Sequence, residues 1–540
     1  MKNRKYIALF FIFSVIISVI FYHLWYINKG LDFGDTGWYL DNYRRASNLK
    51  NFDIGRFYSW YIGSYVAFLN TSQSIIILRL ANKVINLVTY LLIFLIFKKH
   101  INRTFLITLI SLGSLYLIRF PQELSYNNFS FLILVLSFFI YYKNSSGSKL
   151  TFMLVGFILG LSVFFRLPNI IAFLLLIICL LIKKQIKQFK YITLGFLFGL
   201  IFSIIVIIRL IGFSDFFLSS FHYVFQLLSN DNSNTHSSLR LLYNLAYQVA
   251  TIFYIVPLFI ASIYITFIIL LTYFNIKTSD KINKILLFIS VLPAGYFAYI
   301  INLSVFIWFI TLISIIYCLY LWFKDSCIEY LCIPIIVLTF IIGTDNGFQQ
   351  AYFILPLIII GIYIETYPTY LKVIPKFRFA FINFLLVIFI IFSFSFFIQL
   401  NGFVYGENDK IINLVNIHEQ PFIGLRTSRL KADIITKFKN DMKSIISKKP
   451  KLIILGDFPI GFSLTNLDSY FSESWSNLNS IFSLSMFENE LQNYKDENIV
   501  IVIFEDHDSK KNKLLMHFIE HNKFIKMTSN IYYTIFYGGK

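Results

Sequence analysis

Residues 6–40 read YIALFFIFSVIISVIFYHLWYINKGLDFGDTGWYL. An apolar run of about twenty residues, the length that crosses a bilayer, ends near Ile27. Two aspartates, Asp32 and Asp35, follow at once with glycines beside them. A signal peptide would have a shorter apolar core and a cleavage site of small residues, which residues 20–30 lack. The stretch therefore predicts an uncleaved first membrane span followed by an acidic segment at the outer membrane surface.

The composition of the chain predicts a polytopic membrane protein. The 540 residues are 57% hydrophobic and only 14% charged, whereas an ordinary soluble domain carries about 25% charged residues. This excludes a soluble enzyme, a disordered chain, a coiled coil and a disulfide scaffold. Of the net charge of +19, nearly all lies in residues 1–400, which hold 30 Lys and Arg against 12 Asp and Glu. Residues 401–540 hold 17 against 16, so a nucleic-acid surface is not indicated.

The distribution of basic residues predicts the orientation in the membrane. With the N-terminus in the cytoplasm, the inner segments hold 19 Lys and Arg and the outer loops before residue 400 hold 8, which follows the positive-inside rule. We expect an all-α bundle of about 13 spans in the plasma (inner) membrane, with residues 401–540 as an extracytoplasmic domain. The thirteen candidate spans are 6–27, 75–97, 104–118, 129–142, 151–165, 168–182, 191–211, 246–274, 285–301, 303–323, 330–343, 349–365 and 379–400.

Residues 401–540 predict a small α/β domain. KLIILGD (451–457) and NIVIVIFED (498–506) are typical of buried strands. KKNKLLMHFIEHNKF (510–524) predicts an amphipathic helix and IYYTIFY (531–537) a final strand. Trp475 is expected either at the membrane interface or in the core of this domain.

The outer loop 28–74, between the first two predicted spans, is the most unusual part of the sequence. Asp35 and Thr36 are expected to cap a helix through TGWYLDNYRRASNLK (36–50). This segment mixes aromatic side chains with arginines, which suits a helix lying flat at the membrane interface. Asp32 and Asp35 would then lie just outside the first span, where a carboxylate can meet both lipid and water.

Further polar residues gather toward the outer membrane face. On the second predicted span, one helical face carries Arg79, Asn82, Lys83 and Asn86. Charged groups in a bilayer usually face the bundle interior or a watery cavity, so Arg79 is either a paired structural residue or part of an anion site. Arg119 and Glu123 lie in RFPQELSYNN (119–128), and Arg166 lies in FRLPN (165–169). Each is singly consistent with a polar turn, but together they suit a phosphate group, which the planar guanidinium of Arg binds well.

This layout resembles the C-type (GT-C) membrane glycosyltransferases that use polyprenyl-phosphate sugars, among them the protein O-mannosyltransferases and the lipid A aminoarabinose transferase. The resemblance rests on LDFGDTGWYL (31–40) after an N-in first span, on the amphipathic loop segment and on the exported α/β domain. It is strongest over residues 1–210. It implies transfer of a sugar from a polyprenyl-phosphate donor to a glycan, lipid or protein acceptor at the outer face. In that family an Asp of this loop is often followed by Glu; Asp35 matches the Asp, and Thr36 stands in place of the Glu.

The residues suit this chemistry on their own terms. Transfer needs a base for the acceptor hydroxyl, and a carboxylate beside the membrane can supply it. It also needs cations that stabilise the charge developing on the leaving phosphate. Asp35 is the predicted base, with Asp32 as the second candidate. The predicted substrate-binding residues are Arg79, Arg119, Glu123 and Arg166.

No metal ligand is assigned from the sequence. His517, Glu520 and His521 form H-x-x-E-H, the reversed zinc-peptidase pattern, on the predicted helix 510–524. A catalytic zinc of this type needs a third protein ligand, and no acid or histidine follows this motif. We expect a solvated helix face there. A divalent metal near the acidic loop stays open as a cofactor, because Thr36 replaces the Glu of the resembled family.

Two other classes of protein stay as alternatives. A Wzy-type polysaccharide polymerase also acts on lipid-linked sugars, but it relies on large Arg-rich outer loops, whereas the loop 212–245 holds only Arg240. A solute transporter or lipid flippase would carry charges at the middle of the membrane and often an internal repeat. The sequence shows no repeat, and its polar groups cluster at the outer ends of the predicted spans.

Overall fold

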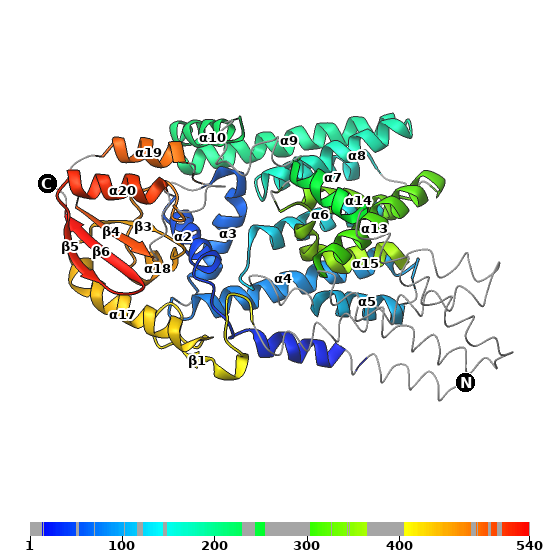
Figure 1. Ribbon diagram of the computed structural model, residues 1–540. Coiled ribbons are helices and arrows are strands. Elements are labelled where there is room, and N and C mark those ends of the chain that lie inside the picture. The colour runs from blue at the N-terminus through cyan, green and yellow to red at the C-terminus, as the bar shows by residue number, and fades with distance from the viewer. Residues whose placement is uncertain are drawn as a thin grey trace.

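The computed structural model describes residues 16–49, 53–69, 71–101, 103–115, 122–143, 148–228, 243–253, 303–325, 327–342, 346–363, 404–476, 484–494, 498–504 and 510–538, with positions 13, 344 and 482. Figure 1 shows a bundle of helices at one end and a sheet domain at the other, with two helices of the first outer loop between them.

The helices of the bundle follow the apolar segments of the sequence. Three described helices, Ser74–Phe97, Ile186–Ile211 and Ile307–Asp325, are long and apolar enough to cross a membrane. A multi-pass bundle is thereby confirmed, while the number of thirteen spans stays a prediction, since 285–301 and 379–400 lie outside the described residues. The bundle helices are Ile16–Tyr26, α4 (Ser74–Phe97), α5 (Arg103–Leu115), α6 (Tyr126–Lys143), α7 (Lys149–Ser162), α8 (Ile170–Ile182), α9 (Ile186–Ile211), α13 (Leu303–Asp325), α14 (Ile328–Ile342) and α15 (Leu355–Tyr363). Shorter turns η3 (Leu167–Asn169) and η4 (Gly347–Ile354) precede α8 and α15, and α10 (Phe213–Leu228) follows α9.

Glycines bring α7 and α9 into backbone contact. A Cβ atom on Gly156 would lie 2.0 Å from the carbonyl oxygen of Ile192, and one on Gly195 would lie 2.0 Å from that of Met153. Small residues four apart let membrane helices approach closely, where lipid supplies no hydrophobic driving force between them. The four glycines at this contact are Gly156, Gly160, Gly195 and Gly199.

The first outer loop forms α2 (Asp35–Ser47), η1 (Ile54–Arg56) and α3 (Phe57–Ala67). The helix predicted over 36–50 is confirmed, whereas its position at the membrane interface stays a prediction. The rings of Trp38 and Tyr43 pack 5.3 and 5.4 Å from the buried ring of Trp60 on α3. Protein therefore covers the aromatic face that the sequence suggested for the membrane interface.

The C-terminal sheet has four strands in the order β3-β4-β6-β5. β3 (Lys451–Leu455) runs parallel to β4 (Ile499–Phe504), and β6 (Tyr533–Gly538) is antiparallel to β4 and to β5 (Ile525–Ser529). Alternate side chains serve two cores, because successive residues of a strand point to opposite faces. One face packs on α17 (Arg429–Ile446) and α18 (Ile460–Thr465), the other on α19 (Leu484–Gln492) and α20 (Lys510–His521). The predicted strands at 451–457, 498–506 and 531–537 and the helix at 510–524 are confirmed as elements.

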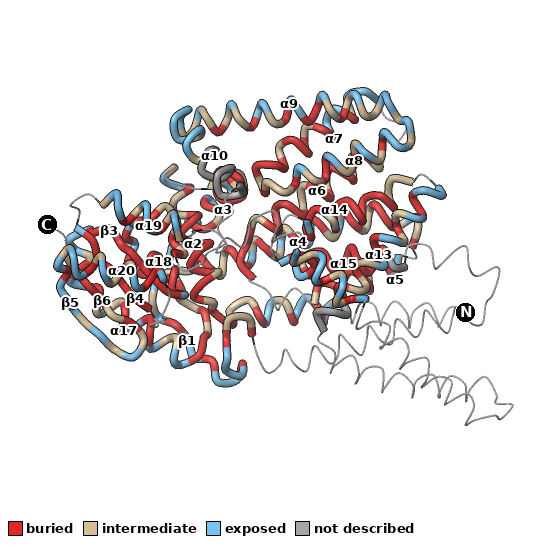
Figure 2. The backbone as a smooth tube through the Cα atoms, turned by 45° about the horizontal axis from the view of Figure 1, so that its top comes forward, coloured by how far each residue is buried: buried red, intermediate tan, exposed pale blue. Residues whose placement is uncertain are grey.

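The loop and the sheet domain share one hydrophobic core. The ring of Phe33, just before α2, packs 5.2 Å from that of Phe458. Backbone bonds extend the contact: Gly30 N–H donates to the carbonyl of Arg426 at 2.9 Å, and Ile460 N–H donates to that of Phe33 at 3.2 Å. Arg426 belongs to β2 (Arg426–Thr427), which pairs with β1 (Val415–Asn416). Figure 2 shows buried residues both in α2 and α3 and in the neighbouring sheet domain.

Candidate active site

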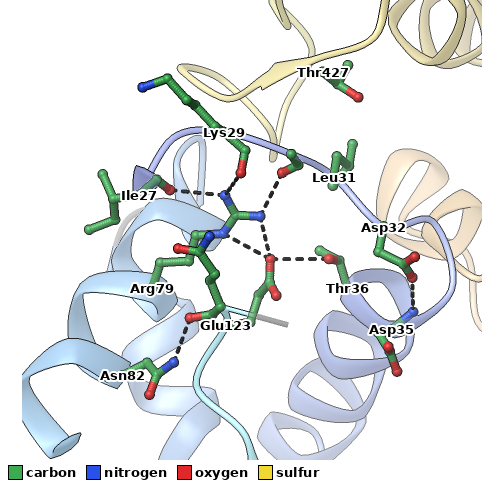
Figure 3. Close-up of polar contacts among 12 residues, drawn as sticks. Ile27, Lys29, Leu31, Asp32, Asp35, Thr36, Arg79, Asn82, Glu123 and Thr427 are labelled. Atoms are coloured by element: carbon green, nitrogen blue, oxygen red, sulfur yellow. Dashed lines mark hydrogen bonds and ion pairs between the residues drawn. The ribbon is translucent and has the colours of Figure 1, made fainter. Parts of the chain in front are cut away.

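The acidic segment enters α2 through a side-chain cap. Gly34 occupies the N-cap position and offers no side chain. The Oδ1 atom of Asp32 instead accepts the backbone N–H of Asp35 at 2.6 Å (Figure 3). The predicted cap by Asp35 and Thr36 is therefore wrong, because the carboxylate three residues earlier already satisfies the amide. The Asp35 side chain is left for other contacts.

The carboxylate of Asp35 lies half-buried under the sheet domain. Its Oδ2 atom accepts a hydrogen bond from the phenol of Tyr405. Burial raises the pKa of Asp35 to about 7, the Asp32 carboxylate adds to the rise, and the bond from Tyr405 opposes it. Burial also raises the pKa of Asp32. A carboxyl group that titrates near neutral pH is suited to proton transfer.

A buried ion pair between Arg79 and Glu123 contacts the first turn of α2 through Thr36. The hydroxyl of Thr36 donates to Oε1 of Glu123 at 3.2 Å. The same oxygen accepts from Nη2 and Nε of Arg79 at 2.8 and 3.0 Å (Figure 3). Glu123, from the segment before α6, thus brings a carboxylate to Thr36. The structure thus brings four predicted site residues together: Asp32, Asp35, Arg79 and Glu123.

Arg79 is fully occupied by the protein. Beyond Glu123, its Nη1 donates to the carbonyls of Ile27 and Lys29 at 3.0 Å each, and its Nη2 donates to that of Gly30 at 2.7 Å. These bonds fix the backbone turn that leads from the first span to Asp32. The geometry favours the paired structural interpretation of Arg79, and its assignment to substrate binding stays a prediction.

The polar face predicted on the second span is confirmed on α4. Asn82 donates to the carbonyl of Gln122 at 2.8 Å, and Asn86 donates to Oδ1 of Asn82 at 2.8 Å. These bonds hold the segment that carries Glu123. Lys83, on the same helix, is half-buried, and within the described part of the chain no hydrogen bond or ion pair joins its ammonium group.

Residues just after the last apolar run complete the site. The Oε1 atom of Glu407 accepts from the N–H of Leu31 at 2.9 Å and from the hydroxyl of Thr427. Lys431 donates to the carbonyl of Leu31 at 2.6 Å. Tyr405, Glu407 and Lys431 were not predicted from the sequence. No spacing or motif distinguishes Tyr405 and Glu407 in VYGEN (404–408), or Lys431 on the helix that follows.

The other two predicted phosphate ligands are Arg119 and Arg166. Arg119 lies outside the described residues, so its assignment stays a prediction. Arg166 precedes η3, where its guanidinium carbon lies 4.9 Å from the ring centroid of Phe340 and its Nη1 lies 3.5 Å from the carbonyl of Thr339. Both of these contacts are with α14.

No metal site is formed by the described residues. They contain no group of three or more His, Cys, Asp or Glu side chains that could hold an ion. His517 and His521 are exposed on α20 with their ring centroids 6.3 Å apart. At the acidic segment, one oxygen of Asp32 and one of Asp35 already accept hydrogen bonds from the protein. A divalent metal at the acidic segment therefore stays a prediction, and the chemistry below is derived from the side chains.

The chain is similar in structure to two membrane glycosyltransferases of the GT-C class. One is the oligosaccharyltransferase of Archaeoglobus fulgidus, in a complex with Zn and sulfate, at 12% identity and a TM-score of 0.47, over 91% of this chain and 68% of that one. The other is ArnT of Cupriavidus metallidurans bound to undecaprenyl phosphate, at 10% identity and a TM-score of 0.42, over 98% and 97%. No protein-family model and no curated protein matches the sequence. The likeness is one of general chain path.

Proposed function

We propose that the protein transfers a sugar from a polyprenyl-phosphate donor to an acceptor hydroxyl at the outer face of the plasma membrane. The observation that carries the proposal is the half-buried Asp35 carboxyl, which accepts a hydrogen bond from Tyr405 and has its pKa raised to about 7. A group that titrates near neutral pH can accept a proton during reaction and release it afterwards. The proposed orientation has the N-terminus in the cytoplasm and the sheet domain outside, as the positive-inside rule predicts.

In this mechanism Asp35 acts as the general base. Tyr405 occupies Oδ2, so Oδ1 is the oxygen that takes the proton from the acceptor hydroxyl. The hydroxyl oxygen forms a bond to the anomeric carbon as the bond from that carbon to the phosphate oxygen breaks. The electron pair leaves with the polyprenyl phosphate. A single displacement of this kind inverts the configuration at the anomeric carbon.

The leaving phosphate needs a cation that the protein does not already use. All five N–H bonds of the Arg79 guanidinium are directed at protein oxygens. Lys83 lies four residues further along α4, and among the described residues no hydrogen bond or ion pair occupies its ammonium group. A compact, flexible ammonium is suited to follow a phosphate oxygen as its charge grows. We therefore assign Lys83 to the phosphate and Arg79 to positioning of the acidic segment.

The test is turnover by the full-length protein in lipid nanodiscs. Undecaprenyl-phosphate sugars of several kinds are supplied, and release of undecaprenyl phosphate is measured. Asp35→Asn is expected to lower the rate at least about 10²-fold, the usual contribution of a general base. Asp409→Asn removes an exposed acid of residues 401–540 and should leave the rate unchanged. A folded Asp35→Asn protein with full activity would clear Asp35, and a wild type that turns over no donor would contradict the donor class.

A further inference from the structure

An indole ring of the sheet domain lies directly against the acidic segment. A Cβ atom built on Gly34 would lie 2.6 Å from Cζ2 of Trp475 and 3.2 Å from Oδ1 of Asp32. Only a glycine at position 34 allows the half-buried ring to approach so closely. Gly34 immediately precedes Asp35, so Trp475 forms one wall beside the proposed base. From the sequence, Trp475 was expected either at the membrane interface or in the core of the C-terminal domain.

An exposed carboxylate is fixed to the same ring. The Oδ1 atom of Asp457 accepts the indole N–H of Trp475 at 3.0 Å. Asp457 follows β3 at a turn through Gly456, whose φ of +119° is in the region that favours glycine. β3 and β4 are parallel, and ligands of open α/β sheets bind beyond the carboxyl ends of such strands. The indole and the carboxylate therefore form one surface at the ligand-binding edge of the sheet.

A second carboxyl belongs to the same segment. Glu473, two residues before the indole, accepts the N–H of Trp38 at 3.4 Å, which connects the segment to α2. Burial raises its pKa to about 7. The backbone carbonyl of Ser472 accepts a hydrogen bond from Arg45, also on α2. The segment 472–476 is thus fixed to the helix that carries Asp35, and it cannot drift from the base without breaking these bonds.

We propose that Trp475 and Asp457 bind one ring of a glycan, and that this glycan is the acceptor of the transfer. The face of an indole ring covers the C–H side of a sugar ring, and a carboxylate accepts hydrogen bonds from two neighbouring hydroxyls. The carboxylates of Asp32 and Asp457 lie beside this surface, so an uncharged glycan is favoured over an acidic one. Identifying the ligand as the acceptor rests on the proposed function; the binding site itself does not.

The experiment measures sugar binding without any lipid donor. Saturation-transfer NMR is recorded on the full-length protein in nanodiscs with the methyl glycosides of glucose, galactose, mannose and N-acetylglucosamine. The wild type is expected to transfer saturation to the ring protons of at least one of them. Asp457→Asn should weaken that binding about tenfold, the effect of losing hydrogen bonds to a charged group. Asp409→Asn, an exposed acid of the same domain, serves as the matched control and should bind like wild type.

A conservative change separates sugar binding from domain docking. Trp475→Phe keeps an aromatic ring over Gly34 but loses the N–H that holds Asp457. It should bind the glycoside more weakly than wild type, with an unchanged unfolding temperature. The proposal is overturned if no glycoside of the panel binds, or if Asp457→Asn binds as wild type does. A protein that releases undecaprenyl phosphate but binds no glycoside would overturn only this site, whereas binding without any turnover would overturn only the proposed activity.

Discussion

The phenol of Tyr405 donates a hydrogen bond to the carboxylate of Asp35 across 370 residues of sequence. This bond favours the ionised carboxylate, whereas burial and the neighbouring Asp32 favour the protonated form. The opposing effects leave the pKa of Asp35 at about 7. Tyr405, from the segment that leads into the sheet domain, therefore lowers the pKa of Asp35 in the first outer loop.

Removing the phenol should shift the pH dependence of transfer upward. In Tyr405→Phe the hydrogen bond that lowers the pKa of Asp35 is lost, so this pKa rises further above 7. A base must be deprotonated to act, so the rate rises with pH through its pKa. We expect the rising limb of kcat/KM against pH to move to higher pH, with nearly the wild-type rate regained well above it. A limb that stays in place would show that Tyr405 does not tune the base.

Removing the neighbouring charge should shift the same limb downward. Asp32→Asn keeps a side-chain oxygen that can accept the Asp35 N–H, so the helix cap is preserved. It removes the carboxylate that raises the pKa of Asp35. The rising limb of kcat/KM is expected at lower pH than in the wild type, opposite to the change in Tyr405→Phe. A shift of both variants in the same direction would refute the electrostatic account.

Breaking the ion pair beneath α2 should destabilise the protein. Arg79 and Glu123 are both almost fully buried, and removing one partner leaves the other charge unpaired. Arg79→Ala is expected to lower the free energy of unfolding by about 3–5 kcal/mol. Thermal unfolding in detergent measures the effect, and Arg429→Ala, at an exposed position, should change little. An Arg79→Ala protein as stable as the control would contradict the positioning role.

A methyl group at Gly37 should separate α2 from the sheet domain. The new Cβ would lie 2.1 Å from the backbone nitrogen of Ile460, at the start of α18. Because backbone cannot move aside as a flexible side chain can, Gly37→Ala is expected to expose the sheet domain to protease and to abolish transfer. Ser47→Ala, at an exposed position of the same helix, is the control. Limited proteolysis with a wild-type pattern in Gly37→Ala would show that the contact is dispensable.

Part of the site could be predicted because its residues break a local pattern. Asp32 and Asp35 stand out after an apolar run, and Arg79 stands out within one. That Arg79 would bond to Glu123 and to three backbone carbonyls could not be predicted, since the pairing depends on where two loops meet in space. Tyr405 carries no local signal at all, because a tyrosine is unremarkable in a chain with 35 of them.

In the fold, too, some elements could be predicted from the sequence and others could not. Strands β3 and β4 are continuous runs of buried residues and were predicted, because both of their faces are covered. β5 reads IKMTS and is mostly exposed, so it offers neither an apolar run nor an alternation. The surroundings of α2 could not be predicted from its sequence. Aromatic and arginine side chains suit both a membrane interface and a protein interior, and here Trp38 packs on the buried Trp60.

The order of the strands in the sheet affects when the domain can fold during synthesis of the protein. β6 (Tyr533–Gly538) lies between β4 and β5, so the sheet stays incomplete until this strand has been synthesised. Non-local pairing of this kind forms late in folding. Only then can the domain dock and bring Tyr405 onto a carboxylate synthesised hundreds of residues earlier. A nascent chain that lacks β6 therefore carries Asp35 without Tyr405 docked on it, and the proposed reactive centre is complete only after the sheet domain has folded.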